Sequence, residues 1–214
     1  GKISFEAISY LVNITKFIII SLAALFIYTK TQKFFAERAS TSAKISLWQA
    51  SSFKLPFGKK KYSLPLWIIV PIITSIISQG QLFFAALLST TISIQPKYRI
   101  GRKFSQATEF ERAKILVMAP IILTLIAIVT NTPLKDIALV CLMIALYSML
   151  PLPGLAGAEI FFGSTPLYIF SIVFIITSAL SLKLFSTFVS LIFALIIALT
   201  ALTTHLWRFF KKKI

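Results

Sequence analysis

This sequence has very few of the side chains that build metal and catalytic sites. It contains one cysteine, Cys141, one histidine, His205, and a single aspartate, Asp136. One cysteine excludes a disulfide within the chain, so Cys141 is predicted to be a small buried hydrophobic residue. A catalytic zinc ion needs three protein ligands from histidine, cysteine or carboxylate side chains. Because these residues are isolated on separate segments, we expect no metal and no cofactor.

Acidic residues are also scarce, with 6 Asp and Glu against 22 Lys and Arg, which gives a net charge of +16. In a soluble chain such a charge would suggest nucleic-acid binding. No basic segment interleaved with aromatics is visible here, so we expect no nucleic-acid partner. The basic loops are predicted to stay on the cytoplasmic side of a cell membrane and to contact anionic lipid headgroups.

Apolar side chains are abundant. The chain is 57% hydrophobic and 13% charged, with a mean hydropathy of +0.90. Several apolar windows reach the roughly 18 residues that a bilayer-spanning helix needs. The sequence therefore predicts an all-α fold: one integral membrane domain over residues 1–214, built as a polytopic transmembrane helical bundle with Gly/Pro-broken helices and five or six spans.

The apolar pattern places helices or helical blocks over 6–28, 64–91, 109–130, 134–150, 166–181 and 184–207. A basic connector, 30–63, is expected to contain an interfacial amphipathic helix. Thr108 with Glu111 is a plausible cap for the helix that follows. The first apolar stretch is long and has no clear small-residue cleavage site, so no cleavable signal peptide is expected.

The basic residues bear on membrane topology. Eight Lys and Arg lie in 30–63, six in 92–114 and four in the tail from Arg208. If block 64–91 spans once, the first two clusters lie on opposite sides and the positive-inside rule fails. If the block is a re-entrant hairpin turning near Ser78–Gln81, all three clusters share a cytoplasmic side, with the N-terminus outside. The sequence leaves both alternatives open.

The segment 151–166 interrupts the apolar helices with Pro151, Pro153, Gly154, Gly157, Gly163 and Pro166. Irregular backbone at membrane depth is tolerated only where protein or a wet cavity surrounds it. Such a break is typical of a functional site or of the remnant of one.

Two segments carry a family resemblance. Residues 148–157 read Ser-Met-Leu-Pro-Leu-Pro-Gly-Leu-Ala-Gly, and 113–122 read Ala-Lys-Ile-Leu-Val-Met-Ala-Pro-Ile-Ile. Taken in chain order, 113–122 and then 148–157, they resemble the site-2 proteases, the intramembrane zinc metalloproteases, over about residues 64–180. That family has an H-E-x-x-H helix, an A-G-P region and N-x-x-P-x-x-x-L-D-G, whose Asp completes the zinc site. The resemblance implies that block 64–91 stands where the H-E-x-x-H helix should be.

The departures from this pattern remove the residues that would bind zinc and catalyse hydrolysis. The family Asp falls on Ala156 and the family Asn on Ser148, and H-E-x-x-H is absent from the whole chain. The resemblance therefore implies a probable pseudoprotease without zinc ligands, which acts as a binding or structural subunit of a membrane complex. A partner helix or extended segment of another membrane protein would occupy the vestigial cleft. The expected cleft residues are Gln79, Gly80, Gln81, Pro153, Gly154, Ala156, Gly157 and Glu159.

Two other functions stay open. The broken helices with Glu159 nearby are also compatible with a small transporter or channel subunit, since an intramembrane carboxylate is a candidate for ion handling. Alternatively, Glu159 is a carboxylate at the membrane edge or is paired with a basic residue. An intramembrane serine protease would need Ser164 as nucleophile within hydrogen-bond reach of His205 as base.

Overall fold

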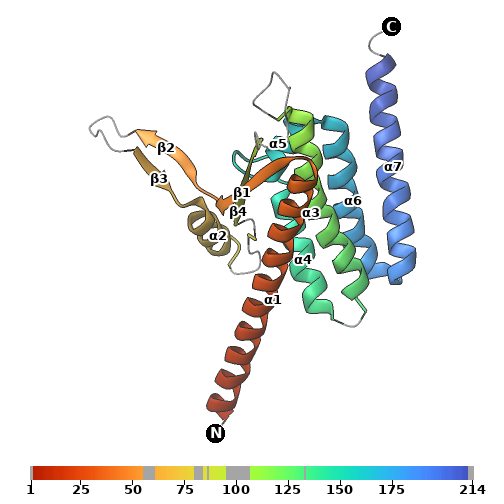
Figure 1. Cartoon of the computed structure of the whole chain (residues 1–214). Coiled ribbons are helices and arrows are strands. Elements are labelled where there is room, and N and C mark those ends of the chain that lie inside the picture. The colour runs from red at the N-terminus through yellow and green to blue at the C-terminus, as the bar shows by residue number, and fades with distance from the viewer. Residues whose placement is uncertain are drawn as a thin grey trace.

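The computed structural model describes residues 2–54, 61–79, 84–85, 87–94, 107–132 and 134–211. Helices make up most of this part of the chain, and four short strands together with α2 lie between α1 and α3 in the sequence (Figure 1). The helices are α1 Lys2–Arg38, α2 Leu66–Ile77, α3 Glu109–Thr130, α4 Lys135–Ser148, α5 Ala156–Gly163, α6 Thr165–Leu184 and α7 Thr187–Lys211. The strands are β1 Thr41–Leu47, β2 Ala50–Lys54, β3 Lys61–Leu64 and β4 Leu88–Ile94.

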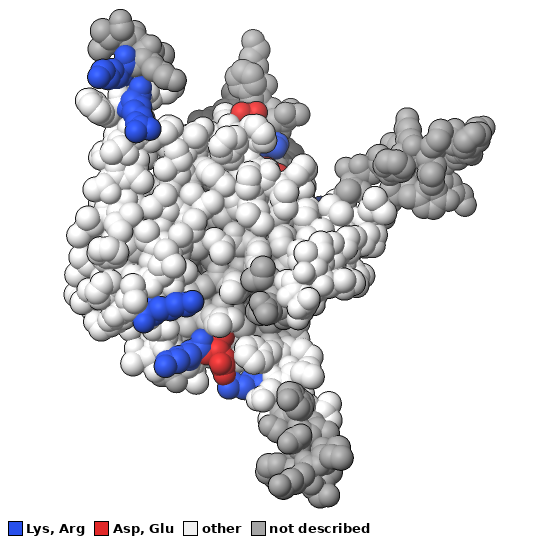
Figure 2. Space-filling model, turned by 180° about the vertical axis from the view of Figure 1, so that it is seen from behind, with Lys and Arg blue, Asp and Glu red and all other residues white. Residues whose placement is uncertain are grey.

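Four helices are long and apolar enough to cross a bilayer, and they support a multi-pass membrane protein. They cover Leu11–Arg38 of α1, all of α3, all of α6 and Thr187–Phe209 of α7. The shortest has 20 residues, which at 1.5 Å per residue matches a hydrocarbon core of about 30 Å. Charged surface lies toward the two ends of the molecule, and the band between them is uncharged on the face that Figure 2 shows.

Helix α3 is the centre of the bundle and contacts α1, α4, α5, α6 and α7. It begins at a capping box in which the Glu111 backbone N–H donates to the Thr108 hydroxyl and the Thr108 N–H donates to the Glu111 carboxylate, both at 3.2 Å. The expected cap is thus confirmed. Pro120 is buried within the helix, and the Thr124 hydroxyl donates to its carbonyl at 2.8 Å.

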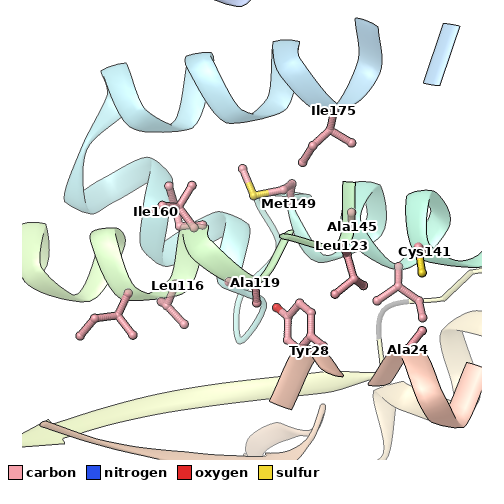
Figure 3. Packing of buried hydrophobic residues seen from close by; sticks show 14 of the residues in the cluster. Ala24, Tyr28, Leu116, Ala119, Leu123, Cys141, Ala145, Met149, Ile160 and Ile175 are labelled. Atoms are coloured by element: carbon pink, nitrogen blue, oxygen red, sulfur yellow. The ribbon is translucent and has the colours of Figure 1, made fainter. Parts of the chain in front are cut away.

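The core around α3 is built from small and aliphatic side chains. Small residues let helices approach closely in a membrane, where burial of apolar surface gives little driving force between helices. Cys141 is 1% exposed, as expected of a buried hydrophobic residue. Figure 3 shows how Ala24 and Tyr28 of α1 meet Leu116, Ala119 and Leu123 of α3, Cys141 and Ala145 of α4, and Met149, Ile160 and Ile175 beyond it.

Helices α4 and α5 together run along the whole of α3. Helix α4 starts directly after the turn that ends α3, where the Leu134 N–H donates to the Thr130 carbonyl at 2.8 Å. Helix α5 ends beside the start of α3, because a Cβ on Gly163 would lie 2.4 Å from the Glu109 carbonyl oxygen. With 14 residues, α4 is about 21 Å long and too short to cross alone. Helices α4 and α5 therefore lie against opposite ends of α3, and the chain between them, residues 149–155, is not helical.

The connector 30–63 differs from the expectation. Helix α1 continues through Arg38, and strands follow in place of an amphipathic helix. Ser40 turns the chain with a φ of 57°, and β1 then pairs antiparallel with β4, from Thr41 opposite Ile94 to Leu47 opposite Leu88. Both strands are rich in Thr, Ser and Ile, which favour pleated structure. The expectation of an entirely α-helical fold was therefore too simple.

Block 64–91 is not one continuous helix, since it contains α2 and the start of β4, and the re-entrant hairpin turning near Ser78–Gln81 stays a prediction. Helix α2 has 12 residues and ends at Ser78, Gln79 has a left-handed φ of 53°, and β4 begins at Leu88. Gly80 and Gln81 lie outside the described residues. In the described part, the C-terminal end of α1, the start of α3 and the C-terminal end of α7 all lie at one end of the molecule, here called the upper end (Figure 1).

Candidate functional site at the broken helix

The break between α4 and α5 satisfies its own backbone by tight turns. The N–H groups of Met149, Leu150, Leu152 and Leu155 donate to carbonyls two or three residues earlier, at distances of 2.8–3.2 Å. The two prolines of the segment have no N–H to satisfy. Gly154 has a φ of 86°, a conformation that glycine adopts without strain. The proline and glycine pattern in the sequence thus correctly marked an interruption of the helix.

Protein side chains cover the break. The Trp48 indole Nε1–H donates to the Pro153 carbonyl at 2.8 Å. Phe84 stacks on Trp48 with ring centroids 5.8 Å apart and lies 4.8 Å from the ring of Tyr147. Leu155, 1% exposed, completes this aromatic cluster. These side chains therefore lie against one side of the break, while residues 151–154 themselves are exposed.

Two of the expected cleft residues, Ala156 and Gly157, have a packing role. A Cβ on Gly157 would lie 2.2 Å from the Met149 carbonyl oxygen, so the first turn of α5 packs on the end of α4 through a bare backbone. Ala156 is 5% exposed at the start of α5. Both belong to the buried centre of the bundle, whereas Pro153 and Gly154 are exposed.

Sequence reasoning missed a buried polar cluster beside the break, formed by Tyr28, Gln32, Thr90 and Ser148. The Tyr28 side chain lies near those of Ser148 and Gln32. The Thr90 hydroxyl donates to Gln32 Oε1. Tyr28 and Gln32 are one helical turn apart on α1, so their spacing in an otherwise apolar helix was the signal that could have found the cluster.

The buried polar cluster borders a small cavity and holds one unsatisfied donor. The cavity has a volume of about 10 Å³ and is lined by Tyr28 and Ser148 with apolar residues of α1, β4 and α4, which is room for about one water molecule. Gln32 is fully buried, and its Nε2 has no hydrogen-bond partner among the described residues. The residues that line the cavity do not include Gln32, so this amide N–H is buried in the protein interior and is not presented to the cavity.

Glu159 lies apart from this cluster, near Arg112 at the upper end of α3. Both side chains line a pocket of about 160 Å³ together with Glu109, Ala158, Phe162 and Gly163. Burial raises the pKa of the Glu159 carboxyl above its usual value, and the positive charge of Arg112 partly offsets this. The structure thus puts Glu159 beside a basic residue and outside the four candidate spans.

The remaining sequence-predicted residues do not converge. Gln79 is exposed just beyond α2, and its place in a cleft stays a prediction. Ser164 lies at the junction of α5 and α6, and no hydrogen bond links it to His205 in the part of the chain that the structure describes. Within the same described part, His205 Nδ1 has no partner, and the ring lines a pocket with residues of its own helix.

The comparisons give no relative. No protein-family model matches the chain, and neither a curated protein nor a solved structure does. Among the described residues, no three His, Cys, Asp or Glu side chains are grouped so that they could hold a metal ion.

Proposed function

We propose that this protein is a non-catalytic relative of the site-2 proteases that binds a membrane-protein partner at the broken helix. The observation that carries the proposal is the position of Tyr28 and Gln32. Tyr28 lies near Ser148 at the end of α4, and Tyr28 and Gln32 have the i, i+4 spacing of the two histidines in H-E-x-x-H. Helix α1, rather than block 64–91, is then the counterpart of the metal-binding helix.

The composition of this site supports binding rather than hydrolysis. A phenol and a carboxamide stand where two imidazoles would be, and Ala156 stands where the Asp would be. Neither Tyr28 nor Gln32 belongs to the Cys, His and carboxylate set that binds zinc.

The surroundings of the break support an extended partner segment. Pro151, Leu152, Pro153 and Gly154 are exposed, and the neighbouring sheet consists of β1 and β4 alone in the described part of the chain. Each of these strands therefore has one edge without a strand partner there, and such edges bind extended chains through main-chain hydrogen bonds. The partner is thus proposed to be a membrane protein with a short extended stretch.

The orientation follows from charge. The described parts of the three basic clusters adjoin the upper end of the molecule, where α1 ends, α3 begins and α7 ends. The positive-inside rule makes that end cytoplasmic and the N-terminal end of α1 external. The protein then resides in the cell membrane, with anionic headgroups against its basic loops.

Site-specific photo-crosslinking in native membranes tests the binding function. A photoreactive residue replaces Leu152, which is 36% exposed at the break, and in a matched control it replaces Phe188, which is 73% exposed on α7. We expect one discrete protein adduct from position 152, mapped by mass spectrometry to an extended stretch of the partner, and only lipid adducts from position 188. Lipid adducts alone at both positions, or cleavage of a captured partner by the purified protein, would contradict the proposal.

A further inference from the structure

The pocket at the junction of α3 and α5 has an unusual distribution of charge. Its volume is about 160 Å³, and its charged lining residues are Glu109, Arg112 and Glu159. The acids come from the first turns of α3 and α5, and Arg112 lies one turn into α3. The pocket thus presents one cation between two carboxylates. A water molecule occupies about 30 Å³ in the liquid, so a pocket of about 160 Å³ accommodates a small headgroup.

Within the described residues, this pocket leaves one cationic donor atom and one anionic acceptor atom without hydrogen-bond partners. Among the described residues, Arg112 Nε and Glu159 Oε2 are buried atoms with no hydrogen-bond partner, and the two side chains do not form an ion pair with each other. Leaving a charged donor or acceptor buried and unsatisfied is costly. A ligand that offers an anionic acceptor to Arg112 and a cationic donor to Glu159 satisfies both atoms at once.

The pocket lies where lipid headgroups meet the protein. Glu109 is the first residue of a candidate span, and Phe162, which lines the pocket, is 77% exposed. An exposed phenylalanine at the end of a span offers an apolar surface to an acyl chain, while the charged groups face the headgroup layer. Figure 2 shows acidic and basic surface side by side at the upper end of the molecule.

We propose that this pocket binds the headgroup of phosphatidylethanolamine, with the phosphate on Arg112 and the ammonium on Glu159 and Glu109. Charge-assisted hydrogen bonds of both kinds are stronger than neutral ones. Phosphatidylcholine has no N–H to donate to Glu159, and phosphatidylglycerol offers only neutral hydroxyl donors, so neither forms a charge-assisted hydrogen bond from a cation to Glu159. This lipid site is separate from the buried polar cluster and does not depend on the function proposed above.

Lipid retention in native mass spectrometry tests the site. The full-length protein is reconstituted in nanodiscs of equal parts phosphatidylethanolamine, phosphatidylcholine and phosphatidylglycerol, then released and weighed with its retained lipid. We expect enrichment of phosphatidylethanolamine over phosphatidylcholine. Glu159→Gln and Arg112→Gln should each reduce it on the order of tenfold, the loss of one charge-assisted hydrogen bond. Lys114→Gln is the matched control, since Lys114 is exposed on α3 and lies over the Phe110 ring outside the pocket.

A second experiment uses only the wild-type protein, so it needs no check that a variant folds. Wild-type protein is compared in nanodiscs whose ethanolamine headgroup carries none, one, two or three N-methyl groups. Each methyl group removes one N–H donor, so retention should fall along the series. Equal retention of all four lipids, preferential retention of phosphatidylglycerol, or an enrichment that survives both Glu159→Gln and Arg112→Gln would overturn the proposal.

Discussion

Trp48 and Pro153 are joined by a hydrogen bond of 2.8 Å from the indole Nε1 to the proline carbonyl, across 105 positions of the chain. The bond ties the end of the β1–β4 sheet to the interrupted helix and satisfies a carbonyl that no helical N–H reaches. The same indole stacks on Phe84 and lies 3.0 Å from the position that a Cβ on Gly154 would take. The Trp48 side chain thus packs against the break and restricts which residue types fit at position 154.

Trp48→Phe should destabilise the protein because it keeps an aromatic ring and removes the donor. We expect a loss of about 0.5–1.5 kcal/mol in the free energy of unfolding, the net contribution of a typical hydrogen bond, since Pro153 is exposed and water can replace the lost donor. Reversible unfolding in mixed micelles measures it. Trp207→Phe on α7, where the indole is 67% exposed, is the control and should change little. Equal effects at the two positions would contradict the role of the bond.

Gly157→Ala should disrupt the junction of α4 and α5. The added Cβ meets the Met149 carbonyl oxygen at 2.2 Å and the Leu150 carbonyl oxygen at 2.5 Å, and neither backbone atom can move without shifting a helix. Overpacking of this kind costs about 1–3 kcal/mol or more. Gly154→Ala meets its nearest atom, in the Trp48 side chain, at 3.0 Å. If it proves the more damaging change in thermal unfolding, the packing account of Gly157 is wrong.

The pair Gln32 and Thr90 allows a double-mutant cycle. Thr90→Val removes the hydroxyl that donates to Gln32 Oε1 and leaves a buried amide without any partner among the described residues, at a cost of about 1–3 kcal/mol. Adding Gln32→Leu removes the unsatisfied amide as well, so the double variant should recover most of that loss. A double variant that is as unstable as the sum of the single variants would show that the two side chains do not interact.

The family resemblance predicts a gain of metal binding. The triple variant Tyr28→His, Gln32→His, Ala156→Asp introduces two imidazoles at the positions that the function proposed above matches to H-E-x-x-H, and a carboxylate where the resemblance places the family Asp. Three such ligands suffice for zinc. We expect about one zinc ion per chain in the folded triple variant and substantially less in the wild type, measured by mass spectrometry of the metal after dialysis. A folded triple variant that retains no zinc would contradict the resemblance.

The stability of the protein should depend on pH through Glu159. Its pKa is raised in the folded state by burial, with Arg112 opposing. Between the unfolded value of 4.5 and the higher folded value, the folded state binds more protons, so stability falls as pH rises through that window. In detergent without ethanolamine lipid, Glu159→Gln should be more stable than the wild type above the window and equal to it below. Unfolding curves that differ equally at every pH would contradict this.

The spans could be predicted from the sequence because each is a local property. A helix such as α3 follows from a continuous apolar run, and its first residue follows from the Thr108–Glu111 cap. The interruption at 151–157 follows from prolines and glycines that cannot continue a helix. These features depend on neighbours within a few positions, which the sequence displays directly.

The short strands were not predicted because the apolar run before β4 was taken as one helical block. Strand β4, Leu-Ser-Thr-Thr-Ile-Ser-Ile, begins at Leu88 near the end of block 64–91, whose hydropathy alone indicates a span. Its partner β1 is separated from it by the connector and α2, and pairing between distant segments is not visible in local composition.

The sequence by itself determined a basic, multi-pass membrane chain with an interrupted helix, because hydropathy, charge and helix breakers act locally. Only the tertiary structure decided which polar groups meet. Tyr28, Thr90 and Ser148 come from α1, β4 and α4, and Arg112 and Glu159 come from α3 and α5. Each meeting depends on how the helices pack around α3, and in a bilayer that packing is set by the fit of small side chains rather than by hydropathy.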